Sequence, residues 1–409
     1  MGASGRAGEI RRVAAELWRG GRGPTLVAVG GGWFLSIGVR LVYPAVLPYL
    51  RTDFGLDLTT AGLLITTLWV AYALGQLPGG LLDDRAGSGR LLVASTAVSA
   101  VTLALVVTVG SVGALFVGTA LFGFATALYG VSRLTLLVTT YPDRGGTAVG
   151  VVQSAGDFGS SVLPPLGSLL AATFAWEVGL GFAVPLFLLA GVGLHVAVPG
   201  DGSGTAETAT LATTLRRVTE AVRDPAIATV IAVQTLGYCI WQSFTAFYPT
   251  YLAEMKSITP TTAAVLFGGL FALGIVVRPI SGTAYDTLGP GRALPIVFAV
   301  ITVTMGLLPF VDGLPALVVV TVMASSILGY ATVTLTYLTE ALDDDIQGIG
   351  IGSIRSGYML VGAGFPTVVG VIADAGFFDE AFFLLAGIGA VATLLSLRMP
   401  GTEGTTSAA

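Results

Sequence analysis

The sequence predicts an all-α membrane protein with twelve transmembrane helices, arranged as two pseudo-symmetric six-helix bundles with both termini in the cytoplasm. Three observations predict this fold class. One motif occurs twice at a fixed spacing, apolar runs recur at the length that crosses a bilayer, and arginines gather in one set of loops.

The repeat is centred on two segments, GLLDDRAGSGR at 80–90 and GTAYDTLGPGR at 282–292, whose matched positions lie 202 residues apart. The same offset aligns Pro164 with Pro366, far from the motif. A single offset held over this distance indicates two homologous halves. Internal symmetry in an apolar chain is typical of secondary transporters.

The composition is that of a membrane protein, with 54% hydrophobic and 11% charged residues. Runs of about 20 apolar residues are long enough to span a bilayer as helices. The predicted spans are 25–50, 59–82, 91–110, 112–141, 147–173, 178–198, 225–252, 262–285, 292–312, 314–342, 346–374 and 379–399. They divide into an N-terminal bundle, 25–198, and a C-terminal bundle, 225–399.

The nineteen cationic residues fix the expected orientation. Most fall on one side of the predicted membrane, whereas Arg51 and Lys256 fall on the other. Because Lys and Arg in short loops stay cytoplasmic, the N-terminal segment 1–24, the linker 199–224 and the tail 400–409 are expected in the cytoplasm. The expected location is the plasma membrane, with several passes through the bilayer and lipid as a partner.

The linker allows two interpretations. Leu211, Leu215, Val218 and Val222 recur at helical spacing, which favours a short amphipathic helix lying on the membrane surface. A solvated connection without such a helix is the alternative.

The chain carries no sign of catalysis or of a bound cofactor. It has no nucleotide-binding loop, nucleophile elbow or zinc spacing, and its single cysteine and single histidine, Cys239 and His195, have no ligand partners nearby in sequence. We therefore expect no enzyme activity, cofactor, metal site or nucleic-acid partner. Energy for any transport is expected from an ion gradient.

The Gly-x-x-x-Asp-Arg-x-Gly pattern after the second span, its echo after the eighth and the basic central linker resemble the major facilitator superfamily over essentially the whole chain. The resemblance implies two bundles that rock around a midplane cavity, with the motif locking the cytoplasmic helix ends as a conformational latch. The expected latch residues are Gly80, Asp84, Arg85, Gly87 and Arg90, with Gly282, Asp286, Gly289 and Arg292 in the second copy. Thr287 replaces the equivalent of Arg85, so the second latch is expected to be weaker.

The resemblance also places the first, fourth, seventh and tenth spans around the cavity. Helical spacing puts polar and aromatic residues on one face of each of these spans. The expected substrate-binding residues are Trp33, Arg40 and Tyr43, then Tyr129 and Arg133, then Gln234, Tyr238 and Trp241, and finally Tyr330 and Tyr337.

Arg40 and Arg133 indicate an anionic substrate. An unpaired guanidinium near mid-bilayer costs about 2.5–3.5 kcal/mol on insertion scales, and Arg can bind two oxygens of a carboxylate or phosphate at once. The alternative is structural pairing with a helix carboxylate or carbonyl. The chain resembles the anion:cation symporter branch of this superfamily in these two arginines and in the segments YALGQLPGG, YPDRGGTAVG and FYPTYL. This resemblance implies organic acids such as sugar acids as substrates.

Proton or sodium coupling is expected at Asp157, with Arg355 beside it, because a buried carboxylate near an arginine can exchange partner, proton and substrate. A static salt bridge from Asp157 to Arg133 or Arg355 is the alternative. The carboxylates that this branch often carries near the two substrate arginines are replaced by Val39 and Thr140. Arg278 precedes the second motif and is expected to be structural.

Together these features predict a secondary transporter of a small organic anion, acting as a monomer. Two other functions remain open. A proton-coupled drug or metabolite efflux antiporter is the main alternative, although the Gly-Pro step expected in its fifth span is Leu163–Pro164 here. A membrane sensor without transport activity is the third.

Overall fold

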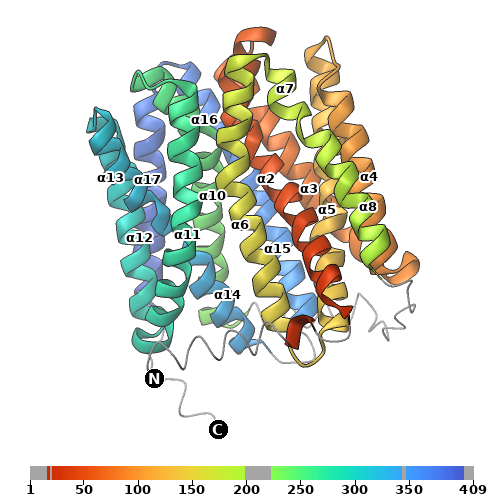
Figure 1. Ribbon diagram of the computed structural model, residues 1–409. Helices are drawn as coiled ribbons and strands as arrows, with labels where there is room; N and C mark the ends of the chain where they lie inside the picture. Colours follow the sequence, from red (N-terminus) through yellow and green to blue (C-terminus); the bar gives the residue numbers. More distant parts are fainter. Residues whose placement is uncertain (1–15, 19–20, 199–222, 343–346, 400–409) are drawn as a thin grey trace.

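The computed structural model describes residues 16–18, 21–198, 223–342 and 347–399 (Figure 1). The N-terminal half contains α2 (Gly23–Phe54), α3 (Leu58–Ala86), α4 (Ser88–Val106), α5 (Val112–Thr140), α6 (Gly145–Thr173), α7 (Trp176–Gly181) and α8 (Ala183–Ala197). The C-terminal half contains α10 (Pro225–Met255), α11 (Pro260–Leu288), α12 (Pro290–Leu307), η2 (Leu308–Phe310), α13 (Leu314–Ala324), η3 (Ser325–Leu328), α14 (Tyr330–Ala341), α15 (Gln347–Ala363), α16 (Phe365–Asp374) and α17 (Phe378–Ser396). The predicted linker helix, the tail and most of segment 1–24 lie outside the described residues.

The described chain is helical, and 11 of its helical segments are long and apolar enough to cross a membrane. Helix α6 is not among these 11, although it has 29 residues and packs against both α2 and α11. Polar residues such as Gln153 and Asp157 lower the hydropathy of this helix. The count of twelve spans therefore stays a prediction.

Three predicted spans are broken helices. The span at 178–198 is divided into α7 and α8, the span at 314–342 contains the 3₁₀ turn η3, and the span at 346–374 is divided at Gly364. Pro366 lies in the first turn of α16. Proline is favoured in the first turn, where N–H groups have no partner within the helix, and it would interrupt a helix that continued through this position.

The two copies of the sequence motif have the same backbone conformation at matched glycines. Gly87 and Gly289 have φ of 85° and 74°, and each ends one helix and begins the next. These left-handed conformations favour glycine, which explains why the motif keeps glycine at both positions. At the same offset, Gly55 and Ser257 both have positive φ, of 64° and 54°.

Figure 1 shows α4 and α8 on one flank and α12 and α17 on the other, with α2, α6, α10 and α11 between them. The most extensive contacts between the halves are those of α6 with α11 and of α3 with α15 and α16, and α2 also packs against α10 and α11. Large apolar side chains are exposed on the flanks, including Leu189 and Val196 on α8 and Leu394 on α17. A surface of this kind suits contact with lipid rather than water.

Close backbone approach brings α3 and α16 together. A Cβ atom added at Gly62 would lie 2.4 Å from the carbonyl oxygen of Pro366, and one added at Gly370 would lie 2.3 Å from that of Leu58. One turn after Gly62 on α3, the hydroxyl of Thr66 lies 2.9 Å from that of Thr367. Glycine therefore allows the two halves to touch along this seam.

The variant Gly370→Ala is expected to destabilise the protein by about 1–3 kcal/mol, because its methyl group has no room beside the Leu58 carbonyl. The measurement is the midpoint of thermal unfolding in detergent micelles. Gly387→Ala is the matched control, since a Cβ there meets nothing within 4 Å. Equal midpoints for the two variants would contradict this account of the seam.

Candidate functional site

A cavity of about 630 Å³ lies between the two halves. Its walls come from both halves, including α2, α3, α5 and α6 on one side and α10, α11, α14 and α15 on the other. It extends along α14 as far as Glu340, next to the last residue of that helix. Among the described residues, no three His, Cys, Asp or Glu side chains come together as a metal site.

Most of the predicted site residues line this cavity. They are Trp33, Arg40, Arg133, Asp157, Gln234, Tyr238, Trp241, Tyr330 and Arg355. The four helices that the family resemblance singled out therefore all contribute to one space.

Three predicted residues lie outside the lining. Tyr43 is fully buried and stacks on Phe122, with ring centroids 6.0 Å apart. Tyr129 donates a hydrogen bond of 2.8 Å to the carbonyl oxygen of Val29, so its ring joins α5 to α2. Tyr337 is half-buried on α14 but does not face the cavity.

Arg40 is fully buried and surrounded by aromatic rings. Its Nε donates to the carbonyl oxygen of Ser36 at 2.8 Å, whereas Nη1 and Nη2 have no hydrogen-bond partner in the part of the chain that the structure describes. The guanidinium carbon lies 3.7 Å from the ring centroid of Tyr72 and 4.9 Å from that of Trp69. These cation–π contacts hold the group in place without neutralising its charge.

Arg133 is held in a similar way by Trp33. Its guanidinium carbon lies 3.6 Å from the centroid of that ring, and its Nη2 donates to Gln153 at 3.4 Å. Nε and Nη1 are buried without partners. Gly156 makes room for the indole, because a Cβ there would lie 2.3 Å from Nε1 of Trp33.

The carboxylate of Asp157 pairs with Arg278, with Oδ1 and Nη2 3.1 Å apart. This ion pair joins α6 to α11 and so links the two halves across the cavity wall. Arg133 and Arg355, the partners in the static salt-bridge alternative, make no ion pair with Asp157. Arg278, expected to be mainly structural, lines the cavity.

Aromatic side chains meet between the halves at one end of the cavity. Trp69 of α3 and Trp241 of α10 are in edge contact, with centroids 5.4 Å apart. Tyr238 stacks on Trp241 at 5.5 Å and meets the edge of Tyr358 at 5.1 Å. This layer separates the cavity from the end of the bundle where α2 ends and α3 begins.

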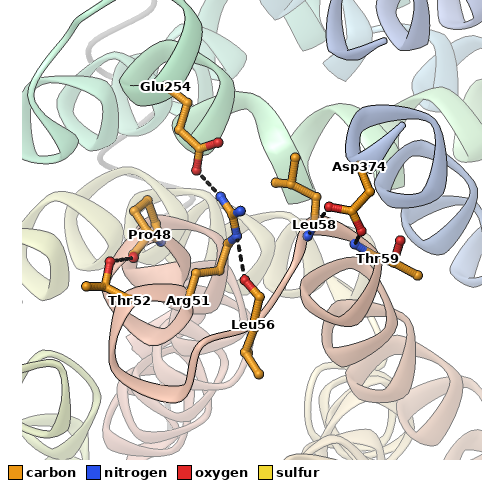
Figure 2. Close-up of polar contacts among 8 residues, drawn as sticks. All are labelled: Pro48, Arg51, Thr52, Leu56, Leu58, Thr59, Glu254 and Asp374. Atoms are coloured by element: carbon orange, nitrogen blue, oxygen red, sulfur yellow. Dashed lines mark hydrogen bonds and ion pairs between the residues drawn. The ribbon is translucent and has the colours of Figure 1, made fainter. Parts of the chain in front are cut away.

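That end of the bundle is held closed by charged groups (Figure 2). Asp374 of the C-terminal half accepts hydrogen bonds from the backbone N–H groups of Leu58 and Thr59, each at 2.7 Å. Asp57 accepts from the N–H of Thr60 at 2.7 Å. The first N–H groups of α3 are thus capped by carboxylates from both halves, at the helix end that favours negative charge.

Two further features belong to the closed end. Arg51 at the end of α2 forms an ion pair with Glu254 of α10 and donates to the carbonyl oxygen of Leu56 at 3.2 Å. Hydrogen bonds from Thr60 lower the pKa of Asp57, so its carboxylate stays charged at the start of α3. We call Asp374 with Leu58 and Thr59, together with the Arg51–Glu254 pair, the closing contacts.

The predicted latch residues lie at the opposite helix ends. Asp84, Arg85, Asp286 and Arg292 are exposed. The neighbouring Asp83 is instead buried and accepts from the hydroxyl of Ser88 at 3.1 Å. Its equivalent in the second half is Tyr285, which donates to Glu340 at the cavity mouth.

Several cavity residues were not predicted as site residues. Trp69 and Tyr72 lie on α3, Gln153 on α6 and Tyr358 on α15, and all four line the space. They fall on helices other than the four that the family resemblance singled out. Arg278 did carry a signal, since it is an arginine inside a predicted span.

Comparison with known proteins gives consistent results. A family model described as Major Facilitator Superfamily matches residues 28–363. The chain is 23% identical over 375 residues to the hexuronate transporter of Bacillus subtilis (strain 168), covering 86% of this chain and 88% of that protein. It is also 23% identical over 272 residues to the nitrite extrusion protein of the same strain, covering 66% of this chain and 67% of that protein.

Among solved structures, the chain resembles that of a bacterial homolog of the human lysosomal transporter Spinster, in an inward-facing and occupied conformation. The TM-score is 0.78 at 13% sequence identity, covering 92% of this chain and 96% of that one. At this identity the likeness concerns the fold alone.

The variant Asp374→Ala removes the carboxylate by which the C-terminal half caps the first N–H groups of α3. We expect the two halves to separate more often at this end of the bundle. With a cysteine placed at Thr66 in a Cys239→Ala background, maleimide labelling of detergent-solubilised protein should become roughly tenfold faster, the factor that corresponds to about 1.4 kcal/mol. A cysteine at the exposed Ser111 is the control and should react at an unchanged rate. Unchanged labelling at Thr66 would show that the cap does not hold this end closed.

Proposed function

The chain belongs to the Major Facilitator Superfamily, and on this premise we propose that it carries a small organic anion across the membrane by alternating access. It is a multi-pass membrane transporter and not an enzyme. The observation that carries the anion proposal is the charge of the cavity. Among the described residues, four arginines line it against two carboxylates, and Arg40 and Arg133 form no ion pair with any of them.

The named relatives support an anion. Hexuronate is a sugar carboxylate and nitrite is an inorganic anion, and these are the compounds in the names of the two Bacillus subtilis proteins. A carboxylate or a phosphate ester fits the planar fork of an arginine, which can donate to two oxygens at once. The aromatic rings around the arginines supply flat apolar surface for the body of the substrate.

For the topology, we propose a monomer with twelve membrane spans and both termini in the cytoplasm. The twelfth span is α6, whose polar residues line the cavity. The arginine-rich loops then lie inside the cell, and the closing contacts lie outside. In this orientation the end of the cavity at Glu340 faces the cytoplasm. The structure then corresponds to the inward-facing state of the cycle.

For the coupling, we propose that Asp157 exchanges partners during transport. Its ion pair with Arg278 crosses from α6 to α11, so movement of one half against the other strains it. A substrate anion competes with Asp157 for guanidinium groups in the cavity, including that of Arg355. A carboxylate released in this way can take up a proton or sodium ion and couple the substrate to a gradient.

For the latch, we propose that the motif residues close the cytoplasmic end in the other state of the cycle. Exposure of Asp84, Arg85, Asp286 and Arg292 is what an open cytoplasmic end requires. Formation of charge-assisted contacts there would accompany release of the closing contacts.

The variants Arg40→Ala and Arg133→Ala are each expected to reduce counterflow of a transported organic anion in proteoliposomes by at least about tenfold, because each removes a charge-assisted contact to the anion. Arg398→Ala, which removes an exposed arginine outside the cavity, should leave counterflow unchanged. Full counterflow of every transported anion in both cavity variants would refute the anion proposal. Binding only of cationic drugs would favour an efflux antiporter.

The variant Asp157→Asn is expected to abolish accumulation driven by an ion gradient while exchange of substrate across the membrane continues. The reason is that asparagine can still occupy the site but cannot take up a proton. Accumulation and exchange are measured side by side in proteoliposomes. Asp312→Asn, at a carboxylate whose side chain is 81% exposed, is the control, and full accumulation by Asp157→Asn would remove Asp157 from the coupling.

A further inference from the structure

We infer that the substrate carries two negative charges, and that the cavity selects a dianion over a monoanion of the same shape. This inference rests on the proposed function and makes it more specific. It follows from the net positive charge of the cavity lining and from the short distance of the Arg40 and Arg133 guanidinium groups from one shared ring.

Among the described residues, the cavity lining has a surplus of two positive charges. Its lining contains Arg40, Arg133, Arg278 and Arg355, against Asp157 and Glu340. Asp157 is already paired with Arg278, and Glu340 lies at the mouth, where it accepts a hydrogen bond from Tyr285. Of the described residues, none forms an ion pair with Arg40, Arg133 or Arg355.

Two of these guanidinium groups share one ring. The guanidinium carbon of Arg133 lies 3.6 Å from the centroid of Trp33, and that of Arg40 lies 5.8 Å from it. Each group keeps two buried nitrogens without partners, Nη1 and Nη2 in Arg40 and Nε and Nη1 in Arg133. Nε1 of Trp33 is a further buried donor without a partner. One small ligand can therefore meet donors from both arginines.

A single negative charge leaves this arrangement incomplete. Arg40 and Arg133 expose 0% and 3% of their surface, so water and salt screen them little, and their mutual repulsion is stronger than at a protein surface. A monoanion compensates one of them and leaves the other buried and unpaired, which is costly. A dianion compensates both and uses the orphan donors.

Two chemical sources share this property. A dicarboxylate places its charges apart, one at each arginine, whereas a phosphate monoester, whose second pKa is about 6, carries both on one group. The test uses thermal stabilisation of purified wild-type protein at pH 8 over a concentration series. One arm compares succinate, glutarate and adipate with their half-amides, and the other compares phenyl phosphate with phenyl sulfate.

Within at least one arm, we expect the dianion to bind about tenfold or more tightly than its monoanionic partner. Arg133→Gln should reduce this preference to within about twofold while the monoanion still binds. Arg133→Lys keeps the positive charge and should keep the preference for the dianion. If the glutamine variant does not fold, this variant is the test, and loss of the preference in it would contradict the inference. Arg398→Gln, outside the cavity, should behave as the wild type.

The outcomes separate this inference from the proposed function. Equal or tighter binding of the monoanions in both arms overturns the dianion inference and leaves an organic-anion transporter. Binding of cationic compounds with no response to any anion overturns both. A preference for the dianion that survives Arg133→Gln assigns the charge selection to other residues and overturns the role given to this arginine pair.

Discussion

Burial of guanidinium groups without carboxylate partners is the constraint on which the central part of the molecule depends. Such groups are expensive inside a membrane unless something holds them and an anion or water compensates them. Here aromatic rings hold Arg40 and Arg133, and Gly156 makes room for Trp33, the ring that they share. The same constraint accounts for the polarity of α6, which provides Gln153 as a partner for Arg133. The fold surrounds a charge that it does not itself neutralise.

Much of the fold can be predicted from the sequence, because lipid requires long apolar helices and the duplication fixes their order. The repeat even anticipates backbone geometry, as at Gly87 and Gly289, where both copies need positive φ. The helix breaks were not predicted. The 3₁₀ turn η3 and the break at Gly364 lie inside stretches that stay apolar enough to be one membrane span each, so a search for apolar runs passes over them. Proline at position 366 was visible, but many helices here contain proline without breaking.

The candidate site could be predicted only in part, because helical spacing shows which residues share a face but not what that face meets. Tyr43 and Tyr129 share faces with the cavity arginines and yet pack against neighbouring helices. Trp69 was not predicted, because it lies on α3, outside the four helices that the family resemblance places around the cavity. The pairing of Asp157 with Arg278 depends on how α6 crosses α11, which is a property of the assembled halves rather than of either helix.

The concentration of indoles around the cavity has an optical consequence. Three of the five tryptophans of the chain, Trp33, Trp69 and Trp241, line this space. Guanidinium groups lie over the rings of Trp33 and Trp69, and Trp69 also makes edge contact with Trp241 across the two halves. Arrival of an anion therefore perturbs Trp33 and Trp69, whereas separation of the halves also perturbs Trp241. The transporter contains its own fluorescent reporters for both events, with no dye attached.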